Sequence, residues 1–595
     1  MGIKAKFKKI KNKSRRFAVK IKNNKCFKYY YKYDLNDKAA IFTCKNGKDL
    51  AGNMLRLMME LHKQMGDGFE IYFATKYRRS VREYVETLLA RYDMSYVKLV
   101  QYNSVNYFKC LETFKYVFCD STLPQKYVKR EGQIYVNTWH GCPMKMMGND
   151  SKSDRFKIGN VQRNFIYSDY MVFTSEYYRD IMFKAYTIDK LYSGNVLLYG
   201  YPRNDIFFNK EKRTEIRKEY GIDDKRVYVY MPTFREASGI NQSALQLIQI
   251  KDYLKYIDDN LRDDEVFYVK LHVFVAAKLD FEEYKNIREF PRDLEVYEFL
   301  NTADCLVSDY SSVMYDFSNS RQKIVRFVYD EQEYYESRGF YEQPVELPFP
   351  KVYNAEDLLE EIRKDKEYDD TELLKFYCTY EEGNAAEKVI KKVMNEEPEK
   401  QVSDVKSYYV YNESAEPGII TENIDKFIEK YDDAEVYLSF SKQALGRRKK
   451  NFDNISQNAD GVMGVTVVVD KMLSEMIAYK LFVNFGIYNK AIEKSLDKMY
   501  KRENAKIFYG FKFDEYVYYQ GRNMNFAEVV AASDKHTIIY VYYNWLFSKK
   551  KRLVKRVLGK YDEIVVCDED MKAYLKDYLG KDYDESKIRV SEFYL

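Results

Sequence analysis

The stretch DCLVSDYSSVMYDF, residues 304–317, passes from a β-like run into a helical pattern within a few residues. The apolar run ends at Ser308, and we expect a helix to begin near Ser311, where free backbone N–H groups, two hydroxyls and the positive helix end would face one point. That point suits a phosphate, although ordinary N-capping by Ser311 or Ser312 is the simpler alternative. A strand that leads directly into a helix is the repeating unit of a parallel α/β sheet.

The same alternation of short β-like runs and longer helical patterns extends in both directions along the chain. It predicts parallel sheets built from βαβ units. A first series begins near residue 38 and a second near residue 195, and two adjacent domains of this kind with a cleft between them are typical of a two-Rossmann-domain transferase. The β-like runs of the two series are AAIFTC, FEIYFAT, YVKLVQY, KYVFCD, QIYVNTW and YMVFTS, then NVLLYG, RVYVYMP, VFYVKLH, DCLVSD and KIVRFVYD.

A change of composition marks a boundary near residues 395–418, where periodicity fades and Pro, Glu and Ser collect. We interpret this segment as a linker. Beyond it lies another series, AEVYLSF, GVMGVTVVV, HTIIYVYYNW, DEIVVCD and KIRVSEFY, which predicts a single further α/β domain. This region carries two basic clusters, GRRKK and KKKRLVKR, which are more often solvated faces than binding sites.

Composition excludes several classes of protein. The 595 residues are 46% hydrophobic and 32% charged, as expected of a folded chain with several cores, and the net charge of +6 does not indicate a general nucleic-acid binder. No apolar run is long enough to span a bilayer, and eight scattered cysteines without CxxC pairs argue against zinc or a disulfide framework.

The N-terminal segment holds the local basic excess. Residues 1–33 contain many Lys and Arg and no acid, and apolar residues recur at helical spacing from Ile3 to Ile21. Such a helix suits an anionic membrane surface, and a solvated tail is the alternative. We therefore expect a cytoplasmic protein, peripheral at the inner face of the cell membrane.

Polar residues come directly after four successive β-like runs of the second series. Because ligands bind beyond the carboxyl ends of strands in open α/β sheets, these residues are candidates for one site. Two cations and a helix N-terminus that converge there would describe a diphosphate site. The residues concerned are Arg203, Asn204 and Asp205, then Thr233 and Arg235, then His272, and finally Asp309, Ser311 and Ser312.

His140 comes after the β-like run QIYVNTW of the first series, and so faces the cleft from the other side. A histidine after a strand is more often structural than catalytic. Here, however, Trp139 can shield the ring, Gly141 lets a ligand approach the backbone, and Lys145 adds a charge. An imidazole with a pKa near neutrality could take a proton from an attacking hydroxyl.

With these residues in view, residues 38–395 resemble the CDP-glycerol glycerophosphotransferase family, the teichoic acid polymerases and primases of Gram-positive bacteria. The resemblance rests on seven short motifs in order. They are WHGCPMKMMG (139–148), GYPRND (200–205), PTFR (232–235), VKLH (269–272), SDYSSVMYDF (308–317), YDEQEYYESRGFY (329–341) and EEGNAAEKVI (381–390).

The resemblance implies a GT-B-like pair of domains and assigns roles by matching position. His140 and His272 would be the functional histidines, and Arg235, Ser311 and Ser312 would hold the donor's phosphates, with Asp309, Thr233 and Arg203 beside them. Supporting positions are Trp139, Gly141, Pro143, Lys145, Asn204, Asp205 and Arg338. No metal and no cofactor is implied, although a divalent ion is not excluded. One departure concerns donor choice, because Val273 and Phe274 stand where the family usually has Pro after the second histidine.

On this basis we divide the chain into five segments. They are a basic amphipathic segment (1–35), an acceptor-side domain (36–190), a CDP-alcohol-binding domain (191–395), a linker (396–418) and an additional α/β domain of unknown role (419–595).

The expected function is transfer of glycerol phosphate, or a related polyol phosphate, from a CDP-activated donor to a hydroxyl of a teichoic-acid-like or capsular polymer, with release of CMP. The expected partners are CDP-glycerol or a related CDP-polyol, a lipid-linked polymer acceptor and an anionic membrane through residues 1–33, but no nucleic acid. Two alternatives stay open: a GT-B glycosyltransferase that uses a nucleotide sugar, and a non-catalytic scaffold in polymer assembly.

Overall fold

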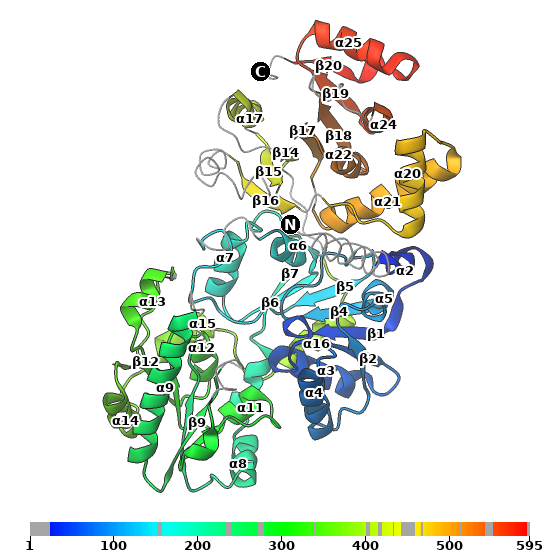
Figure 1. Cartoon of the computed structure of the whole chain (residues 1–595). Coiled ribbons are helices and arrows are strands. Elements are labelled where there is room, and N and C mark those ends of the chain that lie inside the picture. Colours follow the sequence, from blue (N-terminus) through cyan, green and yellow to red (C-terminus); the bar gives the residue numbers. More distant parts are fainter. Residues whose placement is uncertain are drawn as a thin grey trace, which may run out of the picture.

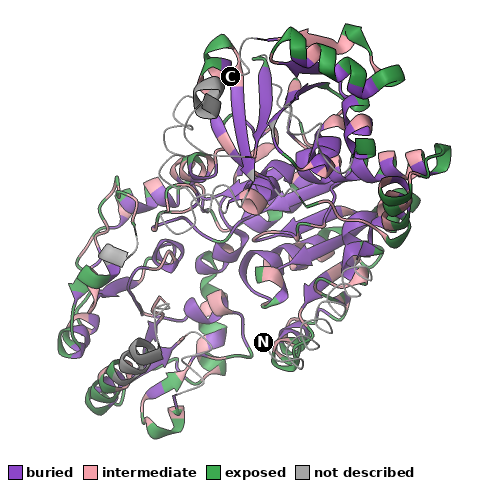
Figure 2. Cartoon of the chain, turned by 45° about the horizontal axis from the view of Figure 1, so that its top comes forward, coloured by how far each residue is buried: buried purple, intermediate pink, exposed green. Residues whose placement is uncertain are grey.

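The computed structural model describes residues 24–151, 158–233, 240–271, 279–337, 339–399, 405–413, 419–431, 433–441, 459–465, 468–511, 513–541 and 551–591. In these residues the chain forms three parallel sheets, each with helices between its strands (Figure 1). The central strands of each sheet are largely buried on both faces, whereas the edge strands and the outer sides of the helices are more exposed (Figure 2). The predicted fold class, an α/β protein with a GT-B-like pair of Rossmann-type sheets and a further α/β unit, is confirmed.

The first sheet has seven strands in the order β3-β2-β1-β4-β5-β6-β7. The order reverses between β1 and β4, and this switch point is where open α/β sheets bind ligands. Its strands are β1 (Asn36–Thr43), β2 (Glu70–Thr75), β3 (Val97–Gln101), β4 (Phe114–Cys119), β5 (Ile134–Asn137), β6 (Tyr170–Phe173) and β7 (Asn195–Leu198). Its helices are α3 (Gly52–Met65), α4 (Arg79–Arg91), α5 (Val105–Thr113), α6 (Gly159–Tyr167) and α7 (Glu176–Ala185), and α2 (Phe27–Lys32) precedes them.

The second sheet has six strands in the order β10-β9-β8-β11-β12-β13. Its short edge strands β10 (Ile287–Glu289) and β13 (Lys351–Val352) were not foreseen, because so few residues show no periodicity. The other strands are β8 (Arg226–Tyr230), β9 (Glu265–Val269), β11 (Cys305–Ser308) and β12 (Lys323–Phe327). The helices are α8 (Lys210–Glu219), α9 (Ile240–Asn260), α11 (Val296–Leu300), α12 (Val313–Ser318), α13 (Glu331–Ser337), α14 (Ala355–Arg363) and α15 (Thr371–Tyr377).

Two elements join the first and second sheets. The 3₁₀ helix η2 (Pro202–Phe208) leads from β7 into the second unit, and α16 (Ala385–Asn395) returns to pack on α3 and η2. Asp205 accepts hydrogen bonds from the backbone N–H groups of Ala385 and Ala386 at 2.8 and 2.9 Å, so one carboxylate caps the returning helix. Burial raises the pKa of Asp205 to about 6.

The third sheet repeats the strand order of the first, as β16-β15-β14-β17-β18-β19-β20. Its strand β14 (Ser407–Asn412) falls inside the segment expected to be a linker and pairs with both β15 and β17, so this unit begins before residue 419. The other strands are β15 (Glu435–Ser441), β16 (Gly461–Val465), β17 (Glu515–Gln520), β18 (His536–Tyr540), β19 (Glu563–Val566) and β20 (Ile588–Val590). The helices are α17 (Ile419–Lys430), α20 (Leu473–Phe485), α21 (Lys490–Phe508), α22 (Met524–Ala531), α24 (Lys551–Lys560) and α25 (Glu569–Leu579).

The third unit is docked on the first through close backbone contact (Figure 1). A Cβ atom on Gly464 of β16 would lie 2.7 Å from the Cα of Gly159 at the start of α6. Gln162 donates to the carbonyl of Val462 at 3.5 Å, and Arg163 donates to that of Lys506 at 3.3 Å. Helix α6 thus covers the edge strand of the third sheet, an edge that would otherwise expose unpaired backbone groups.

None of the described helices is both long enough and apolar enough to cross a lipid bilayer.

Candidate functional site

His140 lies just past the carboxyl end of β5. Its Nδ1 is 3.2 Å from the backbone carbonyl oxygen of Asp120, which comes directly after β4. Because a carbonyl can only accept, Nδ1 carries the proton in the neutral ring, and Nε2 keeps its lone pair. The ring centroid lies 4.2 Å from that of Trp139, so the indole packs beside the imidazole. This tautomer is the one that a general base at Nε2 requires.

The backbone at this turn is strained. Trp139 has a φ of 49°, in the left-handed region that tryptophan seldom adopts. Asn137 accepts a hydrogen bond from the Trp139 N–H at 2.8 Å and so holds the conformation. Strain of this kind persists only where the surroundings fix it, and it is common at functional sites.

The electrostatic surroundings of His140 favour its neutral form. His140 keeps contact with solvent, but protein groups surround it on most sides. They partly desolvate the imidazole, and this desolvation lowers its pKa. The carboxylate of Asp120 opposes the shift, whereas the cations of Arg203 and Lys45 add to it. An imidazole with a lowered pKa is largely unprotonated at neutral pH and can accept a proton.

Gly141 brings the first unit against the second. Its φ is +146°, and a Cβ atom placed on it would lie 2.9 Å from the Oγ of Ser312 and 3.3 Å from Nη2 of Arg203. Ser312 immediately precedes α12, and Ser311 accepts a hydrogen bond from the N–H of Val313 at 3.4 Å. The turn after β5 and the turn before α12 are therefore in contact, with His140 next to both.

The side chain of Arg203 links the two turns. It donates through Nη1 to the carbonyl of His140 at 3.1 Å and forms a 2.8 Å ion pair through Nη2 with Asp316 of α12. Asp316 also accepts from Asn204 at 3.1 Å and from the hydroxyl of Tyr297 at 3.1 Å. Arg203 is buried, and the neighbouring carboxylate of Asp316 helps to keep it charged. The guanidinium is thus engaged by protein groups of both units.

Glu381 closes this network on the side of α16. It accepts from Asn204 at 2.7 Å and from the backbone N–H of Tyr201 at 3.2 Å. Burial raises its pKa to about 8, and the negative charge of Asp316 nearby adds to the shift.

Asp309 and Thr233 shape the ends of two neighbouring strands. The carboxylate of Asp309 is buried after β11 and accepts from the backbone N–H of Thr233 at 2.8 Å and from that of Tyr310 at 2.5 Å. These bonds hold the segment after β8 beside the turn that contains Ser311.

The loop that contains Pro143 and Lys145 crosses to the second unit. Lys145 forms an isolated antiparallel bridge with Phe340, and Met146 donates to the carbonyl of Gly339 at 2.9 Å. The Lys145 ammonium lies 5.2 Å above the ring of Tyr334, and Pro143 is buried. The motifs at 139–148 and 329–341, far apart in sequence, are therefore one structural feature.

Three of the residues expected at the site, Arg235, His272 and Arg338, lie outside the described residues. Within the described ranges, no group of three or more His, Cys, Asp or Glu side chains is arranged to hold a metal ion.

Sequence reasoning missed residues at the carboxyl ends of the first sheet. The backbone N–H of Lys45, after β1, donates to the carboxylate of Asp120 at 2.8 Å, and its ammonium pairs with Asp49 at 2.6 Å. Burial alone would raise the pKa of the Asp49 carboxyl, but the Lys45 ammonium and, to a smaller extent, Lys270 after β9 hold it below its ordinary value. The signal for Lys45 and Asp120 is their place directly after the β-like runs AAIFTC and KYVFC, the same signal that identified the candidates of the second series.

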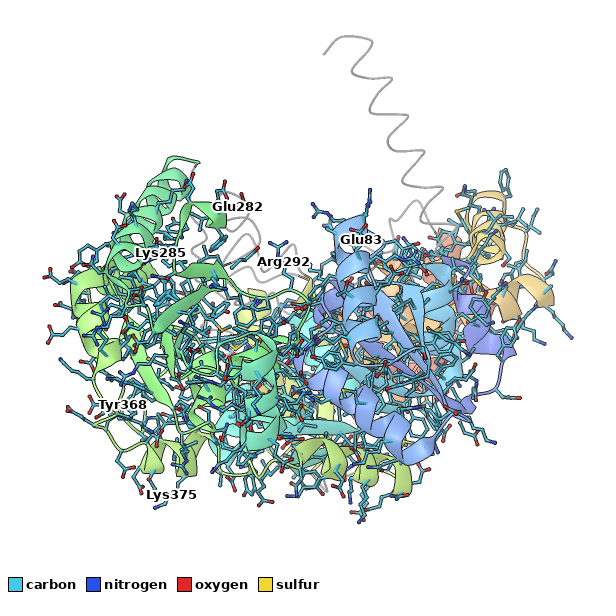
Figure 3. The ribbon with its side chains drawn as sticks, turned by 90° about the horizontal axis from the view of Figure 1, so that it is seen from below. Glu83, Glu282, Lys285, Arg292, Tyr368 and Lys375 are labelled. Atoms are coloured by element: carbon cyan, nitrogen blue, oxygen red, sulfur yellow. The ribbon has the colours of Figure 1, made fainter. Side chains whose placement is uncertain are left out.

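Figure 3 shows the first and second units side by side, with Glu83 on the first unit and Arg292 on the second at their facing edges. Arg292 is near enough to Lys270 to lower its pKa, an effect that adds to desolvation by burial. A neutral imidazole, a pair of serines at a helix start and several cations thus gather where the two units meet, an arrangement suited to proton removal beside a bound phosphate.

Comparisons with known proteins show which proteins this chain is similar to. The chain is 27% identical over 377 residues to the teichoic acid poly(glycerol phosphate) polymerase of Bacillus spizizenii, a match that covers 60% of this chain and 92% of that protein. It is 27% identical over 333 residues to the teichoic acid glycerol-phosphate transferase of Staphylococcus aureus, covering 52% of this chain and 82% of that protein. The solved structure of the wall teichoic acid polymerase TagF matches 66% of this chain and 98% of its own, with a TM-score of 0.54 and 23% identity, which supports the fold.

The family model of CDP-Glycerol:Poly(glycerophosphate) glycerophosphotransferase matches residues 26–395, which leaves the third unit outside it. The resemblance inferred from the seven motifs is thereby confirmed, and the chain belongs to the CDP-glycerol:poly(glycerophosphate) glycerophosphotransferase family.

Proposed function

We propose that this chain transfers glycerol phosphate, or a related polyol phosphate, from a CDP-activated donor to a hydroxyl of a teichoic-acid-like or capsular cell-surface polymer, with release of CMP. The observation that carries the proposal is the contact between Gly141 and Ser312. It sets a neutral histidine of the first unit next to the serine pair of the second. Membership of the family gives the class of donor.

In the proposed reaction His140 acts as general base. The acceptor's terminal hydroxyl gives its proton to Nε2 while its oxygen attacks the β-phosphorus of the donor. The bond from that phosphorus to the oxygen bridging the two phosphates breaks, and CMP leaves with the electron pair. A lowered pKa suits His140 for this step, because the ring must be unprotonated before it can accept.

The donor's phosphates are proposed to lie against Ser311 and Ser312, where hydroxyls and backbone N–H groups are available as donors. Arg235 and His272 are proposed to stabilise charge on the bridging and leaving oxygens. Support for both residues comes from the family motifs that contain them and from their place in the sequence shortly after β8 and β9.

Asp120 and Arg203 are proposed as positioning residues. Asp120 fixes the tautomer of His140 through its carbonyl and the turn of Lys45 through its carboxylate. Arg203 holds the His140 carbonyl and Asp316 together across the two units. Neither needs to touch the substrate for its loss to slow the reaction, because a displaced base loses its alignment with the attacking hydroxyl.

The proposed acceptor is lipid-linked, and the proposed location is the inner face of the cell membrane. Support comes from the basic, amphipathic pattern of residues 1–33, of which residues 24–33 are described and include α2.

The test is CMP release from CDP-glycerol, CDP-ribitol and a panel of UDP-sugars, with a short polyol-phosphate lipid as acceptor. We expect turnover of one CDP-alcohol, its loss in His140→Ala, and full activity in the matched control His536→Ala, an exposed histidine of the third unit. Turnover of a UDP-sugar alone would identify a glycosyltransferase, and no turnover of any donor would favour the scaffold.

A further inference from the structure

Exposed apolar side chains concentrate on one part of the third unit. Among the described residues, six of the sixteen large hydrophobic side chains that are exposed lie between residues 468 and 488. The six are Val468, Leu473, Ile477, Phe485, Ile487 and Tyr488. Phe485 is the most exposed of all sixteen, at 70%. A cluster of exposed apolar side chains on a folded protein is typical of a surface that binds another protein, a membrane or an apolar ligand.

The geometry of α20 sets two of these side chains, Leu473 and Ile477, on one face. Leu473, Ile477, Lys480 and Asn484 are exposed at spacings of four, three and four, so they form one stripe along the helix. Ala478 and Phe482 are buried on the opposite face. The stripe is therefore a surface that the fold presents to solvent.

Gly486 ends α20 in the left-handed conformation, with a φ of 71°, and this sharp turn comes directly after Phe485. Ile487 and Tyr488 come next and are exposed, so the turn forms an apolar tip at the end of the helix.

Cations predominate among the charged residues around this tip. The exposed residues between 473 and 501, all of which the structure describes, include five lysines, whereas the partly exposed Glu493 and Asp497 of α21 lie 4.0 and 3.1 Å from the Lys560 ammonium. The basic cluster of α24 also reaches the tip, because a Cβ on Gly486 would lie 2.6 Å from the guanidinium carbon of Arg552. The lysines are Lys480, Lys490, Lys494, Lys498 and Lys501.

The surface continues onto α2, the described end of the basic N-terminal segment. The hydroxyl of Tyr31 donates to the carbonyl of Lys498 at 2.8 Å, and the Lys498 ammonium lies 5.8 Å from the centre of the Tyr31 ring. Tyr31 and Tyr33 are both exposed. Tyrosine suits the boundary between lipid and water, because its ring is apolar and its hydroxyl polar.

We propose that the exposed faces of α20, α21 and α2, together with the 485–488 tip, form the surface by which the third unit docks on an anionic lipid bilayer. Apolar side chains would enter the headgroup boundary, and the surrounding lysines and Arg552 would face anionic headgroups. A second copy of the chain fits less well, because a twofold interface would bring the same cations of both copies together. The proposal gives the third unit a role of its own and does not depend on the transfer reaction.

The test is co-sedimentation of the full chain with phosphatidylcholine vesicles, with and without roughly 30% phosphatidylglycerol. The anionic lipid supplies the negative surface potential that attracts cationic side chains. Phe485→Ser/Ile487→Ser should lower binding to anionic vesicles at least about tenfold, because two exposed apolar side chains no longer enter the bilayer. Lys490→Glu/Lys494→Glu should lower it by a similar factor of about ten and only at low salt. Tyr353→Ser, at an aromatic of the second unit that is 52% exposed, is the control and should bind as wild type.

A second readout reports insertion directly. Phe485→Trp should show a blue-shifted emission with anionic vesicles and quenching by brominated lipids, whereas Tyr353→Trp should show neither. Full vesicle binding by both double variants would overturn the proposal. A dimer in sedimentation that Phe485→Ser/Ile487→Ser dissociates, without any change in vesicle binding, would overturn it in favour of self-association.

The outcome is separable from that of the proposed reaction. The double variants lie outside the candidate site, so CMP release with a water-soluble acceptor should equal that of wild type. Lost vesicle binding with normal CMP release therefore supports the docking surface, and absent CMP release in wild type leaves the vesicle result intact.

Discussion

The α-carbon of Gly141 faces the side chain of Ser312 so closely that a β-carbon on residue 141 would lie 2.9 Å from the serine Oγ. One residue comes directly after the candidate base and the other precedes α12, so this contact sets the distance between the two halves of the site. The φ of +146° at Gly141 is also one that residues with a side chain rarely adopt.

Gly141→Ala should therefore lower kcat by about 10- to 100-fold, because a shift of even one ångström misaligns the attacking hydroxyl. CMP release under saturating donor measures it. Gly559→Ala, where an added Cβ meets nothing within 4 Å, is the control. An active Gly141→Ala enzyme would show that the two turns need not touch during turnover.

The pH dependence of kcat/KM should report His140. Its pKa is lowered, and a base must be unprotonated, so activity should be constant above about pH 6.5, the ordinary histidine value, and fall as pH drops through the lowered pKa. Asp120→Asn removes a charge that raises this pKa, so the acid limb should move to still lower pH. If the acid limb of Asp120→Asn moves to higher pH, or does not move, the titrating group is not His140.

The unfolding free energy should depend on pH through Glu381. Its folded pKa of about 8 lies above the ordinary 4.5, so the folded state binds the proton more tightly. The contribution is fully present below about pH 4.5 and is lost as pH rises towards 8. Glu381→Gln keeps an acceptor for Asn204 and Tyr201 without the charge.

Urea unfolding at pH 5 and pH 8 measures this difference. Relative to wild type, Glu381→Gln should be more stable at pH 8 than at pH 5, by on the order of 2 kcal/mol. Equal pH dependence of the two proteins would show that Glu381 ionises normally in the folded chain.

Docking of the third unit on the first should be weakened by a side chain at position 464, where β16 packs against α6. Gly464→Val places side-chain atoms where the backbone of Gly159 lies, and overpacking of this kind costs about 1–3 kcal/mol. Hydrogen exchange should become faster in α6 and β16 but stay unchanged in β9 and β11. Unchanged exchange in α6 would mean that the two units can separate without loss.

Arg203→Lys should lower kcat more than it raises KM for the donor. Lysine keeps the charge but cannot bridge the His140 carbonyl and Asp316 with two separate N–H groups. Arg213→Lys on α8, which removes a comparable ion pair with Asp304 away from the site, is the control. A change confined to KM would instead indicate direct contact between Arg203 and the donor.

By itself the sequence determined the class of fold and most of the strands of the first two sheets. Alternating apolar runs and helical patterns are local properties of the sequence. A strand that is buried on both faces needs apolar residues at nearly every position, so it is visible as a continuous apolar run. It also determined the motifs, and through them the family and His140, since each motif is contiguous. It did not reveal β14, whose run SYYVYN stands among polar residues typical of a linker.

Only the tertiary structure decided how these pieces meet. The contact of Gly141 with Ser312, the hold of Asp120 and Arg203 on His140, and the bridge between Lys145 and Phe340 join residues far apart in the chain. So do the docking of β16 on α6 and the approach of Arg552 to the α20 turn. Local periodicity carries no record of such pairs, because they depend on how separate layers pack and on which buried polar groups find partners.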